Sequence, residues 1–380
     1  MRIKILSILV LMAFLLGACA SQEAVTEESE VAETHELDPD FDSTMDPLEV
    51  VYGPPDGGKW KIGFSMSYFG NGWQTQNQNS AISITKVEPF KDKVDLIITV
   101  AGSDVQRQNA QLNELIAQGV DALLVFPISA DGLNQTLKTA CDQGIFVITY
   151  SAGVTEPCVH SVGVDYYEQG KVMAEWLVEQ MGGEGKILMN HGVAGTNPEQ
   201  LRNQGARDVF VNYPDLEVVA EINGDWSGAV SQEAAAQALA ANPTIDGVWS
   251  EGGADGVIRA MLANDMPLVP TTGEGTNGFH RLLVDPEMQE KGLIGMSTSD
   301  PAYDGAMAIK LAVAALEGYD VPQNYVMPIP TVYPDDLKVC DALDPGCNTF
   351  PPDLMPDDWF VDMFRPDLPL TLTGYITGNP

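Results

Sequence analysis

Apolar and polar positions alternate in regular blocks through the middle of this 380-residue chain. Short runs rich in Val, Ile and Leu, such as Val94–Val100 and Ile145–Tyr150, are separated by segments whose apolar residues are spaced as on one helix face, such as Val105–Gln118 and Ala130–Gln143. Continuous apolar strands that alternate with helices are typical of a parallel sheet covered on both faces. Two further strands of this series are predicted at Trp60–Met66 and Ala122–Phe126.

The same alternation starts again after Asp165, with helices of roughly 10–18 residues between the strands, a usual length for globular helices. Two successive series predict an α/β protein made of two doubly wound, Rossmann-like lobes with a cleft between them. The strands predicted for the second lobe are Lys186–Met189, Leu216–Ile222, Gly247–Ser250, Leu268–Thr271 and Leu293–Met296.

The N-terminal segment has the pattern of an export signal. A basic start, Met1–Lys4, precedes the apolar run Ile5–Leu16, which is too short to span a bilayer comfortably. The segment ends in Leu-Gly-Ala-Cys19, which resembles the bacterial lipobox and implies that residues 1–19 are a lipoprotein signal with Cys19 acylated. An ordinary signal with an incidental cysteine is the alternative. Residues 20–58 are rich in acids and contain no Lys or Arg, so we expect a disordered tether.

The net charge is −35, with 44% hydrophobic residues, which indicates a foldable core under an acidic surface. Nucleic acid is an unsuitable partner for such a surface, because phosphate binding needs clustered Lys and Arg. Four cysteines remain besides Cys19, and export permits disulfides. Four cysteines allow three disulfide pairings. A zinc site is the alternative, but zinc ligands usually come in closely spaced pairs, and these cysteines do not have that spacing. We predict the bonds Cys141–Cys158 and Cys340–Cys347, the second closing a turn-rich loop distant from the ligand.

Polar and aromatic side chains follow the predicted strands at their carboxyl ends, where doubly wound sheets bind ligands. Carboxylates, amides and hydroxyls exchange hydrogen bonds with a polyol, and aromatic faces cover the C–H faces of a sugar ring. The plain alternative is that such loops are polar in any protein. The candidates are Ser65, Ser67, Tyr68, Asn71, Trp73, Gln74, Ser151, Ala152, residues 191–197, Asp225, Trp226, residues 251–253, Glu274, Ser299 and Asp300.

Several ordered motifs over residues 59–334 make the chain similar to the periplasmic sugar-binding proteins of the ribose and galactose type. The first is IGFSMSYFGNGWQ at 62–74, which resembles a subgroup with a Gly-Asn-x-Trp loop. The others are LIAQGVDALLVF at 115–126, GIFVITY at 144–150, GVAGTNPEQLR at 192–202, DGVWSEGG at 246–253 and GMSTSDP at 295–301.

The resemblance implies a type I periplasmic binding protein fold, in which the chain crosses between lobes near Val164–Asp165, Ser299–Asp300 and Pro330–Thr331. The first lobe would then hold 59–164 plus 300–330, and the second 165–299 plus 331–380 with a proline-rich tail. Carried over to this sequence, the ligand contacts fall on Asn71, Trp73, Gln74, Ser151, Gln200, Trp226, Glu251 or Gly252, Glu274, and Ser299 or Asp300.

Two departures from the ribose-type pattern put ribose itself in doubt. Ser151-Ala152 stands where those proteins have an Asp-Arg pair, and Gln200 stands where they have another arginine. Arginine–carboxylate pairs fix several hydroxyls at once. The expected ligand is therefore a monosaccharide or related polyol of unspecified identity.

The resemblance implies a monomeric, lipid-anchored receptor at the cell envelope that delivers its solute to an ABC permease, without enzymatic activity, metal or cofactor. Two alternatives remain: an exported hydrolase using Glu251 and Glu274, since glycosidases use paired carboxylates, and a ligand presenter for a chemoreceptor. A literal GxGxxG at 273–278 lies too late in its lobe for dinucleotide binding. The acid pairs Asp335–Asp336 and Asp357–Asp358 are interpreted as solvated surface of the tail.

Overall fold

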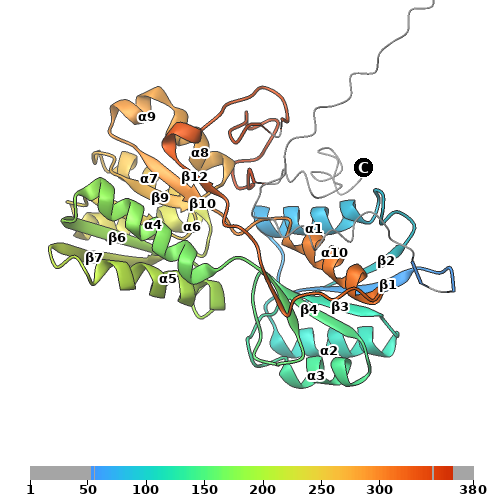
Figure 1. Ribbon diagram of the computed structural model, residues 1–380. Helices are drawn as coiled ribbons and strands as arrows, with labels where there is room; N and C mark the ends of the chain where they lie inside the picture. Colours follow the sequence, from blue (N-terminus) through green and yellow to red (C-terminus); the bar gives the residue numbers. More distant parts are fainter. Residues whose placement is uncertain (1–52, 55, 345, 363–380) are drawn as a thin grey trace, which may run out of the picture. The chain divides into compact units, whose positions relative to one another are not determined.

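The computed structural model describes residues 53–54, 56–344 and 346–362 (Figure 1). The predicted export signal, Cys19 and the greater part of the predicted tether lie outside these residues. In the part of the chain that is described, no helix is both long enough and apolar enough to cross a membrane.

Two six-stranded sheets organise the described chain, each with the order typical of doubly wound folds. The first runs β2-β1-β3-β4-β5-β11 and is parallel throughout. Its strands are β1 (Trp60–Met66), β2 (Val94–Val100), β3 (Ala122–Val125), β4 (Phe146–Tyr150), β5 (His160–Gly163) and β11 (Asn324–Val326).

The second sheet runs β7-β6-β8-β9-β10-β12, and only its edge strand β12 is antiparallel to its neighbour. Its strands are β6 (Gly185–His191), β7 (Leu216–Asn223), β8 (Gly247–Ser250), β9 (Thr271–Glu274), β10 (Gly295–Thr298) and β12 (Thr331–Val332). The predicted α/β fold with two parallel-sheet lobes is therefore confirmed.

Helices cover both faces of the first sheet, because its strands bury side chains alternately on the two sides (Figure 1). Phe64 and Ile148 pack with α1 (Gly72–Ile84) and α10 (Asp304–Leu316). Leu123 and Val147 pack on the other side, with α2 (Val105–Ala117) and α3 (Asn134–Asp142). We call this sheet with its four helices the first lobe.

The second lobe repeats the arrangement on the second sheet. Ile187 and Met189 contact α4 (Tyr166–Met181) and α5 (Asn197–Phe210), whereas Leu188 lies on the opposite side. The helices on that side are α6 (Gly228–Ala241), α7 (Ala254–Ala263), α8 (Asn277–Val284) and α9 (Pro286–Glu290). The chain passes from one sheet to the other between β5 and α4, between β10 and α10, and between β11 and β12.

Some predicted bounds are wrong, for a physical reason. The strand predicted at Leu268–Thr271 is β9 at Thr271–Glu274, and the strand predicted at Leu293–Met296 is β10 at Gly295–Thr298. The buried residues of both strands are largely Thr, Ser and Gly, whereas apolar residues lie just before each strand, so apolarity alone predicts a strand that begins too early. The helix predicted at Ala130–Gln143 begins later, at Asn134.

Both predicted disulfides are present. Cys141 and Cys158 have Cα atoms 6.5 Å apart, and Cys340 and Cys347 have Cα atoms 6.1 Å apart, which is within the range of bonded cysteines. The first bond joins the end of α3 to the loop that follows β4 and begins with Ser151.

Residues 334–362, here called the tail segment, bind to both lobes. This segment begins with the short 3₁₀ helix η3 (Pro334–Asp336). In the first lobe, the side-chain amide of Gln76 donates to the Phe360 carbonyl (2.9 Å) and accepts from the Phe360 N–H (2.6 Å). In the second lobe, the N–H groups of Asn277 and Gly278 each donate over 2.8 Å to tail carbonyls, those of Trp359 and Asp357. The segment is thus held by α1 and by α8.

Candidate functional site

A cavity of about 370 Å³ lies where loops at the carboxyl ends of both sheets meet the tail segment. Ligand pockets are usually of this order of size or larger. Its wall includes residues after β1, β3 and β4 in the first lobe and after β7, β8 and β10 in the second. The lining residues used below are Tyr68, Asn71, Trp73, Phe126, Ser151, Arg202, Trp226, Asp255, Arg259, Glu274, Asp300, Asp357, Asp358 and Phe360.

Arg202 is the buried cation of the wall, with only 2% of its surface exposed. Helix α5 directs it inward, where its guanidinium lies 3.2 Å from Glu274 Oε1 and donates from Nε to Gln169 Oε1 at 2.9 Å. The same group lies 5.1 Å from the ring centre of Tyr166. Burial opposes the charge, but the carboxylates of Glu274, Glu251 and Asp300 outweigh it and raise the pKa of Arg202.

Arg202 corrects one expectation. The family pattern suggested that an arginine was replaced by Gln200 and that an arginine–carboxylate pair was missing. Gln200 is exposed and lies outside the described wall, whereas Arg202, two residues further along α5, forms a buried ion pair with Glu274. Two residues along an α-helix change the direction of a side chain by about 200°. Gln200 therefore lies on the exposed face of α5, whereas Arg202 lies on the inward face.

Asp300 is a second buried carboxyl group of the wall. It follows β10 and accepts hydrogen bonds from residues of other elements. Ser151 donates to its Oδ2 over 2.5 Å, and the Tyr166 hydroxyl lies 2.9 Å from the same oxygen. Oδ1 is buried without a hydrogen-bond partner. Burial raises the pKa of Asp300, against the lowering effect of Arg202. Asp300 lines the cavity, and its unpartnered Oδ1 leaves capacity for one further hydrogen bond.

Two tryptophans from different lobes contribute to the wall. Trp73, in α1, is 8% exposed, and its indole N–H donates to the Asp300 carbonyl at 2.9 Å. Trp226, after β7, is half-buried, and its indole N–H points to Glu251 Oε2 at 3.4 Å. A Cβ atom at Gly192 would lie 2.1 Å from the Trp226 ring, so the indole packs directly on that glycine. Trp226 is therefore in the cavity wall and not in the hydrophobic core.

The other predicted residues take several positions. Asn71 lines the cavity and caps α1 by accepting from the Gln74 N–H at 2.9 Å. Gln74 itself is fully buried behind this turn, and neither polar atom of its amide has a hydrogen bond of ordinary geometry. Glu251 and Gly252 lie directly behind Trp226, and Ser299 lines a separate cavity.

Sequence reasoning missed several wall residues. Asp255 and Arg259 on α7 pair with each other, and no strand-end argument selects them because they lie within a helix. Asp357 and Asp358 were expected to be solvated tail surface. They are exposed, but both also line the cavity, and Asp357 pairs with Arg281 at 2.6 Å. The proline-rich tail has no periodicity from which to place it.

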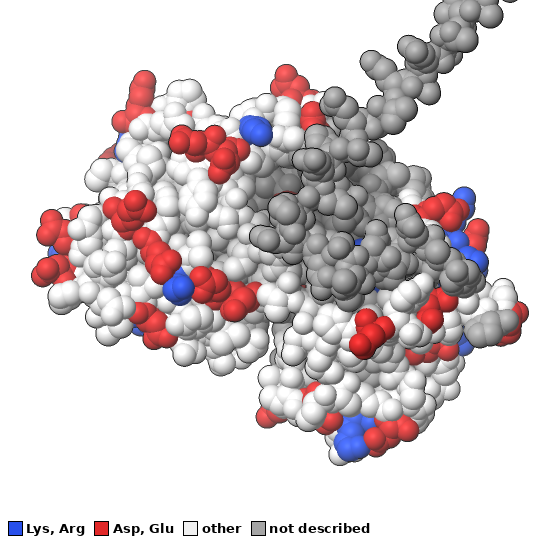
Figure 2. Space-filling view, in the orientation of Figure 1, with Lys and Arg blue, Asp and Glu red and all other residues white. Residues whose placement is uncertain are grey.

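The charge balance of the wall is acidic. Among the described residues, five carboxyl groups line it, those of Asp255, Glu274, Asp300, Asp357 and Asp358, against the two guanidinium groups of Arg202 and Arg259. Burial raises the pKa of Glu274 to about 8 and also raises the pKa of Asp300, although Arg202 acts to lower both, so these two buried carboxyl groups add less negative charge than the exposed Asp357 and Asp358. On the face drawn in Figure 2, the described surface is also acidic, with carboxylates scattered widely and basic side chains in small isolated groups. Such a wall disfavours an anionic ligand.

Comparison with known proteins shows which protein family has this architecture. Residues 62–320 match the model of the periplasmic binding protein domain family. The chain is 26% identical over 257 residues to the xylitol-binding protein of Mycolicibacterium smegmatis, covering 65% of this chain and 71% of that protein. It is 24% identical over 279 residues to the ribose import binding protein of Bacillus subtilis, covering 71% of this chain and 86% of that protein.

Among solved structures, an ABC transporter solute-binding protein of Bacillus halodurans with bound myo-inositol has the same fold. Its TM-score is 0.67 at 23% identity, covering 74% of this chain and 97% of that one. The protein belongs to the periplasmic binding protein domain family, of the type I fold. It is therefore a solute-binding protein and not an enzyme.

Proposed function

We propose that this protein captures a neutral monosaccharide or related polyol in the cavity and delivers it to an ABC-type importer. The observation that carries the proposal is the polar wall formed by both lobes. It combines the buried Arg202–Glu274 pair with Asp300, whose Oδ1 has no partner, and with the ring of Trp226. Fixed donors and acceptors beside an aromatic face are the groups that bind hydroxyls and C–H faces of a polyol.

The names of the relatives agree with this ligand class. Proteins named for xylitol, galactofuranose and ribose match the chain over 65%, 73% and 71% of its length. Structures of the same fold contain myo-inositol and D-allose. These ligands share several adjacent hydroxyls and carry no charge, which fits a wall with more carboxyl groups than guanidinium groups.

The mechanism follows from where the wall residues originate. Ser151 belongs to the first lobe, whereas Arg202 and Trp226 belong to the second. A solute that binds both sets stabilises the arrangement in which they face each other, as in the hinge closure of periplasmic binding proteins, which are the standard example of this motion. The permease would recognise that arrangement. We further propose that Cys19 carries the lipid anchor that keeps the receptor at the envelope, as a monomer.

The hydrolase alternative required Glu251 and Glu274 to act together on one solute. Glu274 lines the cavity, but Glu251 is fully buried behind Trp226 and faces His191. The pair therefore does not flank a common substrate position.

Isothermal titration calorimetry with a solute panel tests the proposal. The panel contains xylitol, ribose, allose and myo-inositol, with gluconate and glucose 6-phosphate as anionic controls. We expect saturable one-site binding of at least one neutral polyol and no binding of the anions. Tight binding of an anion in preference to every neutral solute would overturn the proposed ligand class.

A further inference from the structure

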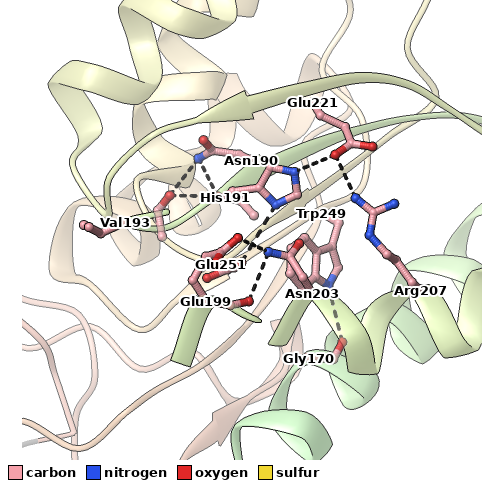
Figure 3. A network of polar contacts seen from close by, with 12 residues as sticks. Gly170, Asn190, His191, Val193, Glu199, Asn203, Arg207, Glu221, Trp249 and Glu251 are labelled. Carbon is pink, nitrogen blue, oxygen red and sulfur yellow. Dashed lines mark hydrogen bonds and ion pairs between the residues drawn. The ribbon is translucent and has the colours of Figure 1, made fainter. Parts of the chain in front are cut away.

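A second polar cluster lies in the second lobe, next to Trp226, whose indole nitrogen is 3.4 Å from Glu251 Oε2. Figure 3 shows this cluster from close by. It consists of His191 at the end of β6, Glu199 in α5 and Glu251 after β8. One side-chain donor atom of each residue lies within 4.8 Å of the others. His191 is 6% exposed and Glu251 is fully buried, so the cluster is largely shielded from water.

Two atoms that face each other in this cluster lack hydrogen bonds. His191 Nδ1 and Glu251 Oε1 are both buried without a hydrogen-bond partner. They are 3.9 Å apart, which is within ion-pair distance when His191 is protonated but too long for a hydrogen bond. Buried polar atoms are rarely left unsatisfied, so each such pair needs an explanation. Two donors that each bind a cation at about 2.1 Å can be separated by up to roughly 4.2 Å, and this pair lies within that limit.

The surroundings of His191 are those of a metal-binding histidine. Its Nε2 lies 3.1 Å from Glu221 Oε2, and that carboxylate also accepts from Arg207 at 2.7 Å. With Nε2–H donated to Glu221, the lone pair of Nδ1 points to Glu251 (Figure 3). Histidines that bind metals commonly donate their other ring N–H to a carboxylate in this way.

Glu199 is held in place as well. Its Oε1 accepts from the Asn203 side-chain amide at 2.7 Å, and its Oε2 accepts from the Gly195 N–H at 3.3 Å. A carboxylate has about four lone-pair sites, so these bonds leave capacity for a further ligand bond.

We propose that His191, Glu199 and Glu251 form a binding site for one divalent cation of the zinc type. The donor set decides the class of ion. One imidazole nitrogen with two carboxylates suits Zn²⁺, whereas Mg²⁺ and Ca²⁺ prefer oxygen donors alone. No local sequence pattern indicates this site, because Glu251 is far in the chain from His191 and Glu199, and the three residues meet only after β6, α5 and β8 have packed together.

The site connects to the solute cavity through Glu251. Its Oε1 would bind the cation while its Oε2 accepts from the Trp226 indole at 3.4 Å. The cation would thus orient the carboxylate that holds Trp226, and its role is structural. If the proposed function is right, cation and solute binding favour each other by equal factors, as linkage requires.

Zinc titration of the full-length protein, treated with EDTA and without any solute, tests the site. We expect one Zn²⁺ per chain by calorimetry and by metal analysis, with little response to Mg²⁺. His191→Asn and Glu251→Gln should each weaken this binding at least 100-fold. The matched control is His160→Asn, which removes a histidine of the first lobe and should leave the affinity unchanged.

Co²⁺ provides a second readout, independent of heat. A Co²⁺ absorption band that appears in the wild type and in His160→Asn, and is missing in folded His191→Asn, supports the site. Should a His191 variant fail to fold, Glu251→Gln carries the test alone. No stoichiometric Zn²⁺ binding, or equal binding by Glu251→Gln and the wild type, would overturn the proposal and leave His191 as a protonated partner of the two glutamates. Because no solute is used, this result is separate from the fate of the proposed function.

Discussion

Phe360 tests whether the tail segment is an integral part of the fold. Its ring is 5% exposed and packs in the core of the first lobe, although it is far in sequence from the strands of that core. Its backbone N–H and carbonyl bind Gln76, and both groups are retained when alanine replaces the side chain. Phe360→Ala therefore deletes the buried ring almost in isolation. Deleting a buried phenylalanine ring usually costs about 3–5 kcal/mol, the sum of lost burial and a residual cavity.

Urea unfolding of the solute-free protein measures this loss. We expect Phe360→Ala to lower the free energy of unfolding by about 3 kcal/mol with an unchanged m-value. Phe69→Ala is the control, because Phe69 is 48% exposed, and it should change stability by no more than about 0.5 kcal/mol. A loss below about 1 kcal/mol for Phe360→Ala would mean that the tail segment is not packed into the core, since buried Phe→Ala changes cost more.

Three further predictions concern the cavity wall, acid stability and a disulfide. Trp226→Ala should weaken solute binding at least tenfold, about 1.4 kcal/mol, with little change in the melting temperature; early unfolding with normal affinity would contradict its place in the wall. Burial lowers the pKa of His280 to about 4, so the unfolded state takes up a proton at a higher pH than the folded state does. The stability that neutral His280 contributes is therefore fully present above about pH 6.5, and it is lost by about 1.4 kcal/mol per pH unit as the pH falls toward 4. Urea midpoints at pH 7 and pH 5 should therefore differ less for His280→Asn than for the wild type, and an equal difference would refute the assignment. Replacing Cys141 and Cys158 together by serine should cost about 3 kcal/mol on the same assay, and an unchanged midpoint would show that the bond contributes nothing.

The fold could be read from the sequence where burial and apolarity coincide. β1 and β2 have the predicted bounds because apolar residues dominate both: they occupy alternate positions from Trp60 to Met66 in β1, and they form most of Val94–Val100 in β2. β5, β11 and β12 gave no such signal. They are two to four residues long, lie toward one edge of their sheets, and include residues such as His160 and Asn324. Their pairing depends on neighbouring strands rather than on their own composition.

The candidate site could be predicted only as far as it lies at strand ends. Ser151, Glu274 and Asp300 follow or end strands, and the rule that parallel sheets bind ligands at their carboxyl ends is enough to group them. Arg202 reaches the cavity from the inward face of a helix. Phe360 reaches it from a tail that no local pattern places. Both depend on tertiary packing, which the periodicity of a single sequence does not encode.

The proposed function requires that a polyol binds in the cavity through Asp300 and leaves unchanged. Calorimetry of the wild type and of Asp300→Ala, with the best-binding neutral solute and mass spectrometry of the recovered solute, tests it most directly. We expect one-site binding by the wild type, at least tenfold weaker binding by folded Asp300→Ala, and a solute of unaltered mass. Equal affinity of the two proteins, no binding of any neutral polyol, or a chemically altered solute would contradict it.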